Sequence, residues 1–67
     1  MSDKSEPVTF EKSQAVAEST KALLCIIDDE EYWIPKSQIH EDSEVSEVGD
    51  EGDLIISEWL AIEKGLV

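Results

Sequence analysis

The stretch ALLCIIDDEEYWIP, residues 22–35, decides the fold because it places two strand patterns on either side of a tight turn. Its first part, Ala22 to Ile27, is continuously apolar and partly β-branched, which is typical of a strand that is central in a small sheet or buried on both faces. The DDE of residues 28–30 supplies the turn, since Asp tolerates the left-handed backbone conformation that a tight hairpin requires. A return strand then runs from Glu31 to Pro35, where proline ends it for lack of an N–H group.

Trp33 lies in the return strand on the face opposite to its two neighbours, so we expect its side chain to be half exposed. It also begins the aromatic-led segment WIPKSQI, residues 33–39, which contains no carboxylate and one cation, Lys36. In one interpretation Trp33 and Ile39 belong to the core. In the other, Trp33 is an anchor on a partner protein, with Lys36 and Gln38 as its polar rim, because exposed tryptophan is over-represented among binding hot spots.

The end of the chain predicts a third strand and a short helix. The strand covers Asp53 to Ile56, and the helix covers Glu58 to Lys64. Ser57 is a natural N-cap for this helix, and Gly65 is a suitable residue just beyond its C-terminus. Leu66 is then placed to fold back onto the last helical turn.

These elements predict an α+β fold, a small three-stranded antiparallel sheet with one short C-terminal helix. A small SH3-like or OB-like barrel is the alternative. The helix is expected to bury Trp59 together with Leu60 or Ile62. Residues 1–21 contain few large apolar side chains and are predicted to form a flexible, disordered tail, which leaves residues 22–67 as the single domain.

The chain is strongly acidic: its 67 residues carry 17 Asp and Glu against five Lys and no Arg, for a net charge of −12. Without a basic stripe, direct binding of nucleic acid is disfavoured. The same charge attracts proteins with basic surfaces, although acidity that serves only solubility is the alternative. Residues 28–53 contain one cation, Lys36, and eleven carboxylates, namely Asp28, Asp29, Glu30, Glu31, Glu41, Asp42, Glu44, Glu47, Asp50, Glu51 and Asp53.

No pattern in the sequence indicates catalysis, a metal or a cofactor. Pairs of carboxylates are so frequent that none is specific for acid–base chemistry. The stretch from Glu44 to Ile55 has a glycine at the sixth position, as in an EF-hand, but Ile55 stands where the bidentate glutamate must be. His40 and Cys25, the only residues of their kinds, lie on different elements and give no zinc spacing. We therefore predict a protein that is not an enzyme.

The apolar run of residues 22–27 also bears on location and redox chemistry. At six residues it is too short for a signal sequence or a membrane span, and the start of the chain is polar, so a cytoplasmic protein is expected. Cys25 lies inside this run. A buried, inert thiol is the expected state, and an intermolecular disulfide is the alternative.

The string WIPKSQIH at residues 33–40, followed by SEV at 43–45, GDLIISEWLA at 52–61 and KGL at 64–66, resembles a family of very short proteins encoded in phage and prophage genomes. The resemblance covers residues 22–66. It departs at residues 28–30, where such proteins tend to carry Asp-Gly-Glu, and this leaves the hairpin type open. The resemblance implies a phage origin and the cytoplasm of a bacterial host.

Size, charge and this resemblance together predict a non-enzymatic inhibitor of host nucleic-acid-handling, defence machinery. Small acidic phage inhibitors of CRISPR and restriction enzymes sometimes stand in for nucleic acid, and here the carboxylates of residues 28–31 and 41–53 would act as phosphate surrogates. One alternative is a phage replication or recombination accessory protein that docks a phage partner through Trp33. A further alternative is a structural homodimer that pairs an exposed edge strand.

Overall fold

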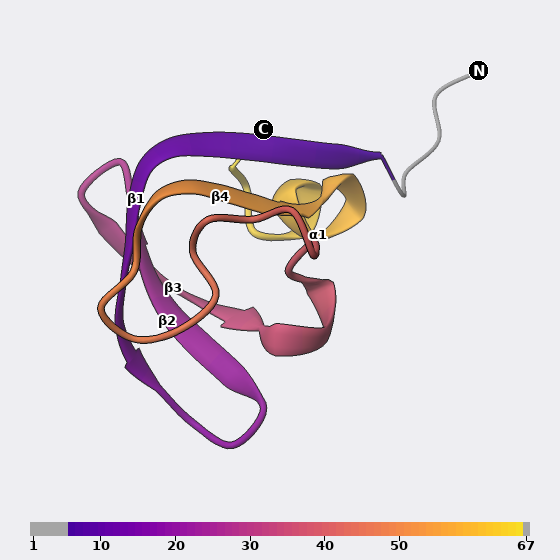
Figure 1. Cartoon of the computed structure of the whole chain (residues 1–67). Coiled ribbons are helices and arrows are strands. Elements are labelled where there is room, and N and C mark those ends of the chain that lie inside the picture. Colours follow the sequence, from indigo (N-terminus) through magenta and orange to yellow (C-terminus); the bar gives the residue numbers. More distant parts are fainter. Residues whose placement is uncertain (1–5, 67) are drawn as a thin grey trace.

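Four antiparallel strands form one sheet in the order β3-β2-β1-β4 (Figure 1). The computed structural model describes residues 6–66. A single 3-10 turn follows β3, and one short helix follows β4. The elements are β1 (Pro7–Glu18), β2 (Ala22–Ile27), β3 (Glu30–Pro35), η1 (Lys36–Gln38), β4 (Glu51–Ser57) and α1 (Glu58–Glu63).

The strand β1 corrects two predictions, the three-stranded sheet and the disordered tail. Pro7–Glu18 is a twelve-residue strand that pairs with β2 on one side and β4 on the other, so the predicted boundary between residues 21 and 22 separates two paired strands. Residues 1–5 of the predicted tail lie outside the described residues. The sequence conceals this strand because its fully buried side chains, Ser13 and Ala15, are both small. The alternation of large apolar residues that marks a strand is therefore missing.

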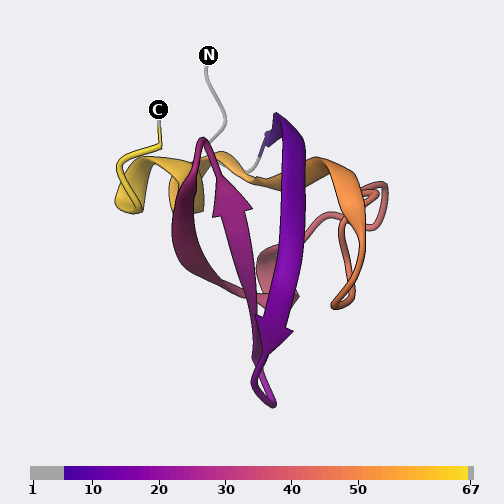
Figure 2. The same cartoon turned by 90° about the vertical axis from the view of Figure 1, so that its left-hand side faces the viewer.

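Two bulges bend β1 around the core. One extra residue interrupts its pairing with β4 between Phe10 and Ser13, where Lys12 has a φ of 61°. The buried Ser13 hydroxyl donates to the Phe10 carbonyl at 2.9 Å and satisfies a backbone group at this bulge. A second irregularity lies between Ala15 and Ala17 in the pairing with β2. Bulges bend a strand, and Figures 1 and 2 show β1 turning from β4 to run beside β2.

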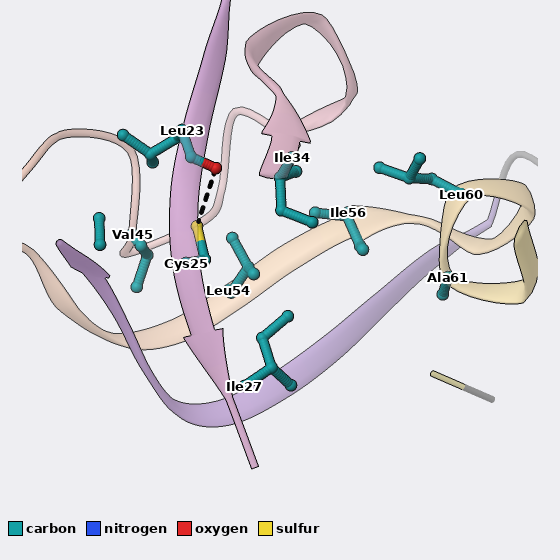
Figure 3. Close-up of a cluster of buried hydrophobic side chains, with 10 residues drawn as sticks. Leu23, Cys25, Ile27, Ile34, Val45, Leu54, Ile56, Leu60 and Ala61 are labelled. Carbon is teal, nitrogen blue, oxygen red and sulfur yellow. Dashed lines mark hydrogen bonds between the residues drawn. The ribbon is translucent and has the colours of Figure 1, made fainter. Parts of the chain in front are cut away.

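The core lies on the inner face of this curved sheet, under α1 and the loop before β4 (Figure 3). In β2 alternate residues are fully buried while Leu24 and Ile26 are half-buried on the outer face, so the continuous apolar run is covered on one face only. Each fully buried large side chain contributes about 1.5–3 kcal/mol. The core residues are Ala15, Leu23, Cys25, Ile27, Ile34, Val45, Leu54, Ile56, Leu60 and Ala61.

The hairpin between β2 and β3 confirms the predicted turn. Ile27 pairs with Glu30, and the two residues between them, Asp28 and Asp29, have φ angles of 53° and 68°. Two successive positive φ angles define the turn whose twist matches that of the flanking strands. Glycine is the preferred residue at its second position, which Asp29 occupies.

Replacing Asp29 by glycine is expected to stabilise the protein. Non-glycine residues in the left-handed region are strained by about 1 kcal/mol or more, so Asp29→Gly should raise the melting temperature by roughly 4–8 °C for a chain of this size. Thermal unfolding followed by circular dichroism measures the change. The matched control is Asp42→Gly, which removes the same charge from an exposed turn where φ is not positive. An equal gain in both variants would assign the effect to charge instead of backbone strain.

The C-terminal segment ends as the sequence predicts. The Leu66 N–H donates to the Ala61 carbonyl at 2.8 Å, and the Gly65 N–H donates to the Ile62 carbonyl at 3.1 Å. Gly65 has a φ of 77°, and Leu66 packs against the core. This pair of bonds is the Schellman motif, in which a glycine allows the chain to turn back over the last helical turn.

The buried face of α1 differs from the prediction. Leu60 and Ala61 are buried, whereas Trp59 is 40% exposed and Ile62 51% exposed. The two exposed residues are three apart and share the helix face opposite to the core. The prediction that Trp59 is buried is therefore wrong, whereas of its two predicted partners Leu60 is the buried one. No helix within residues 6–66 is long and apolar enough to cross a membrane.

The segment after β3 crosses from one edge of the sheet to the other. Here η1 turns the chain, and Ile39 forms a single antiparallel bridge with Ile56 of β4. Ile39 also packs against the core. The strands β3 and β4 themselves do not pair, so the sheet is open, as in the fold that the sequence predicts.

Candidate protein-binding surfaces

The outer edge of β4 is covered by residues 39–45. The His40 N–H donates to the Ile55 carbonyl at 2.7 Å, and the Glu44 N–H donates to the Asp53 carbonyl at 2.9 Å. In return, the Asp53 N–H donates to Glu44 Oε1 at 3.0 Å. Backbone groups along this edge are thereby paired, as natural proteins require of strand edges.

Ser43 fixes this covering segment, and sequence reasoning missed it. Its hydroxyl accepts the Ile55 N–H at 3.0 Å and lies 2.9 Å from the Val45 carbonyl. The side chain thus takes the place of a strand partner, and Val45 behind it is fully buried. The available signal was a serine two residues before an isolated apolar residue, since short hydroxyl side chains bond to nearby backbone groups.

The hydrogen bonds of residues 39–45 to β4 also place residues 41–53 at one end of the sheet. We call residues 41–53 the acidic lobe. Its base is fixed to β1, because the Ala15 N–H donates to the Asp50 carbonyl at 2.9 Å and the Gly49 N–H donates to the Ala15 carbonyl at 3.0 Å. The lobe contains no lysine. Its seven carboxylates are Glu41, Asp42, Glu44, Glu47, Asp50, Glu51 and Asp53.

Two of these seven carboxylates shape the lobe itself. Asp50 Oδ2 accepts the N–H groups of Ser46 and Glu47, each at 3.1 Å. Glu44 lies against Gly52, whose φ is 134° and where an added Cβ would stand 2.5 Å from Glu44 Oε1. Glu44 and Asp50 therefore bond to backbone groups of the lobe, and all seven carboxylates lie at least partly in solvent.

Residues 28–31 place four further carboxylates on the β2–β3 hairpin. The Tyr32 hydroxyl donates to Glu30 Oε2 at 3.3 Å. Partial burial raises the pKa of Tyr32, and the charge and hydrogen bond of Glu30 and the charge of Asp28 raise it further. The β1 bulge lies between this hairpin and the acidic lobe, because Glu11 and Lys12 line one open hollow with Asp28 and another with residues 51–53. The predicted acidic residues thus form two groups.

Trp33 is 46% exposed, as expected from its place in the return strand. Leu24 of β2 lies directly opposite, half-buried on the same outer face. Ile39, in contrast, packs against the core. The interpretation that places both residues in the core therefore fails for Trp33, while the interpretation of Trp33 as an anchor on a partner stays a prediction.

The two predicted rim residues, Lys36 and Gln38, both bond to other side chains of the same chain. Lys36 Nζ forms an ion pair with Glu18 Oε1 at 2.7 Å. Both partners are exposed, so the pair contributes at most about 1 kcal/mol. Gln38 Oε1 accepts the Ser57 hydroxyl at 3.0 Å, which joins η1 to the end of β4. Ser57 occupies the predicted N-cap position of α1. Its hydroxyl bonds to Gln38, however, and accepts no N–H group of the helix.

The residues with potential chemistry are separate within the described chain. His40 Nδ1 accepts the Asp42 N–H at 3.1 Å in an exposed turn. Cys25 is fully buried, as expected, and burial raises the pKa of its thiol to about 11. Across residues 6–66 no three His, Cys, Asp or Glu side chains gather in a way that could hold a metal ion.

Comparison with known proteins yields no relative: no family model, no curated protein and no solved structure matches this chain. The resemblance to short phage proteins therefore stays a prediction. The surfaces that bear on function are the acidic lobe, the acidic β2–β3 hairpin and the Trp33 face of the sheet.

Proposed function

We propose that the protein is a non-enzymatic binding module for a protein with a basic surface. The observation that carries this proposal is the acidic lobe, where seven carboxylates and no lysine are held against one end of the sheet. A surface of one charge sign accelerates association with an oppositely charged partner, most strongly at low salt.

In its specific form, the proposal makes the protein a phage-encoded inhibitor of host nucleic-acid-handling, defence machinery. The exposed carboxylates of the lobe and the hairpin then substitute for phosphates on a basic groove. This form is supported by the charge, by the small size and by the resemblance of residues 22–66 to short phage proteins.

The second candidate is an accessory protein of phage replication or recombination that docks a phage-encoded partner through Trp33. The specific observation in its favour is the 46% exposure of this tryptophan beside Leu24. Trp33→Ala should then cost binding about 2 kcal/mol or more, and added salt should change the affinity little.

The experiment is an affinity capture from nuclease-treated bacterial lysate, repeated with excess duplex DNA. A nucleic-acid-binding protein that DNA displaces supports the inhibitor form. Capture that DNA leaves unchanged contradicts nucleic-acid mimicry, and the absence of any captured host protein contradicts a host target.

Charge-reversal variants then test the lobe on the captured protein. The variant Glu41→Lys with Glu47→Lys is compared with Glu6→Lys with Glu63→Lys, which changes the net charge equally at exposed positions outside the lobe. We expect the lobe variant alone to lose more than tenfold in affinity at low salt. Equal losses in the two variants would show that net charge, not the lobe, governs binding.

A further inference from the structure

The strand β3 is an open edge, in contrast to β4. It is the last strand on its side of the sheet, and within residues 6–66 no segment pairs with its outer side. Residues 39–45 cover the other edge of the sheet. An uncovered edge strand presents N–H and C=O groups to any extended chain that reaches it.

The phase of the ladder shows which groups of β3 face outward. The Lys36 N–H donates to the Lys21 carbonyl at 2.8 Å, in register with the pairs of β2 and β3. In an antiparallel ladder alternate residues bond to the same neighbour, so the even-numbered residues of β3 bond to β2. The backbone N–H and C=O groups of Glu31 and Trp33 therefore point away from the sheet. Pro35 has the same phase and needs no partner for an N–H group.

The side chains beside this edge are aromatic and acidic. Glu31 and Trp33 are two residues apart, so both project from the outer face, and both are exposed. The nearby turn adds Asp28, Asp29 and Glu30. Two lysines lie at the far end of β3: Lys36, which is paired with Glu18, and Lys21, which lies opposite Lys36 in the ladder.

We propose that β3 accepts an extended segment of a basic protein as a fifth strand. This proposal rests on the proposed function and specifies the chemistry of the partner. Main-chain bonds form to Glu31 and Trp33, and lysine or arginine at every second position lies over the Trp33 ring and the Glu31 carboxylate. A second copy of this chain is the poorer occupant, because each copy carries a net charge of −12 and the same four carboxylates beside its edge.

Two variants of one residue separate the backbone edge from the charge. Glu31→Pro removes the carboxylate and the outward N–H group. Like Pro35 in the parent chain, a proline at this position breaks no hydrogen bond to β2. Glu31→Gln removes the same charge and keeps the N–H group. Any difference in binding between these two variants reports on strand addition.

The probe is an eight-residue peptide of alternating lysine and valine, titrated into isotope-labelled protein at low salt. We expect hydrogen exchange at the amides of Glu31 and Trp33 to slow at least tenfold on binding, while Tyr32 and Ile34, already bonded to β2, change little. Glu31→Gln should bind within about threefold of the parent, and Glu31→Pro should lose at least tenfold. The same peptide with every backbone nitrogen methylated should not bind, and this control leaves the protein unaltered.

Equal binding by the two variants, or no protection at Glu31 and Trp33, overturns strand addition. If the peptide instead perturbs only the acidic lobe, strand addition fails while the proposed function stands. If neither this peptide nor any lysate protein binds, both fail. A dimer in sedimentation that Glu31→Pro dissociates would make a second copy the occupant and overturn the proposal of a basic partner.

Discussion

A chain that starts at Ala22 is expected to be unfolded. It lacks β1, the strand that joins β2 to β4, so the sheet would divide into a two-stranded hairpin and a single strand. An isolated hairpin is marginally stable at best in water, and a core of this size supplies only about 3–5 kcal/mol in total. Far-UV circular dichroism and amide dispersion in NMR spectra measure the outcome. A well-dispersed spectrum from the shortened chain would show that β1 is dispensable.

Two substitutions in the full chain test the same strand without truncation. Ala15→Asp places a carboxylate at a position that is 1% exposed, and its burial without a partner costs more than the core provides. Gln14→Asp is the matched control, since its side chain is exposed on the same strand. We expect only Ala15→Asp to unfold the protein.

The thiol of Cys25 is expected to react at least about 100-fold more slowly in the folded chain than in the denatured chain at pH 8. Burial raises its pKa from 9.0 to about 11, and the thiolate fraction falls in proportion. Complete burial of the side chain excludes the reagent as well. Timed reaction with a chromogenic disulfide reagent, with and without denaturant, measures the ratio. Similar rates would place the thiol at the surface.

Ionisation of the same thiol makes the folding stability decrease as the pH rises. Its folded pKa lies above its unfolded pKa, so its contribution is fully present below pH 9 and is lost as the pH rises through about 11. Tyr32, whose pKa is also raised, acts in the same sense. In Cys25→Ala, stability should fall less steeply between pH 9 and 11 than in the parent chain. Denaturant titrations at these pH values compare the slopes.

The sequence predicts the hairpin of β2 and β3 well, because an apolar run, two aspartates and a proline each carry a local signal. It does not predict β1, whose buried residues are small and whose partner β4 is distant along the chain. The burial of Trp59 fails for a related reason. A six-residue helix offers two possible buried faces, and only its packing on the sheet selects Leu60 and Ala61.

For the candidate surfaces, composition predicts the charge but not its arrangement. The exposure of Trp33 follows from alternation in β3. The roles of Ser43 and Glu44 depend on how the loop lies against β4, since each bonds to residues about ten positions away. Nothing in the local sequence distinguishes Glu44 from the other carboxylates around it.

The two outer strands of the sheet differ in whether they can accept a further strand. Within the described chain, residues 39–45 cover the outer edge of β4, whereas β3 has no strand partner on its outer side. One added strand fills the edge at β3, so the complex formed there should have a stoichiometry of one to one.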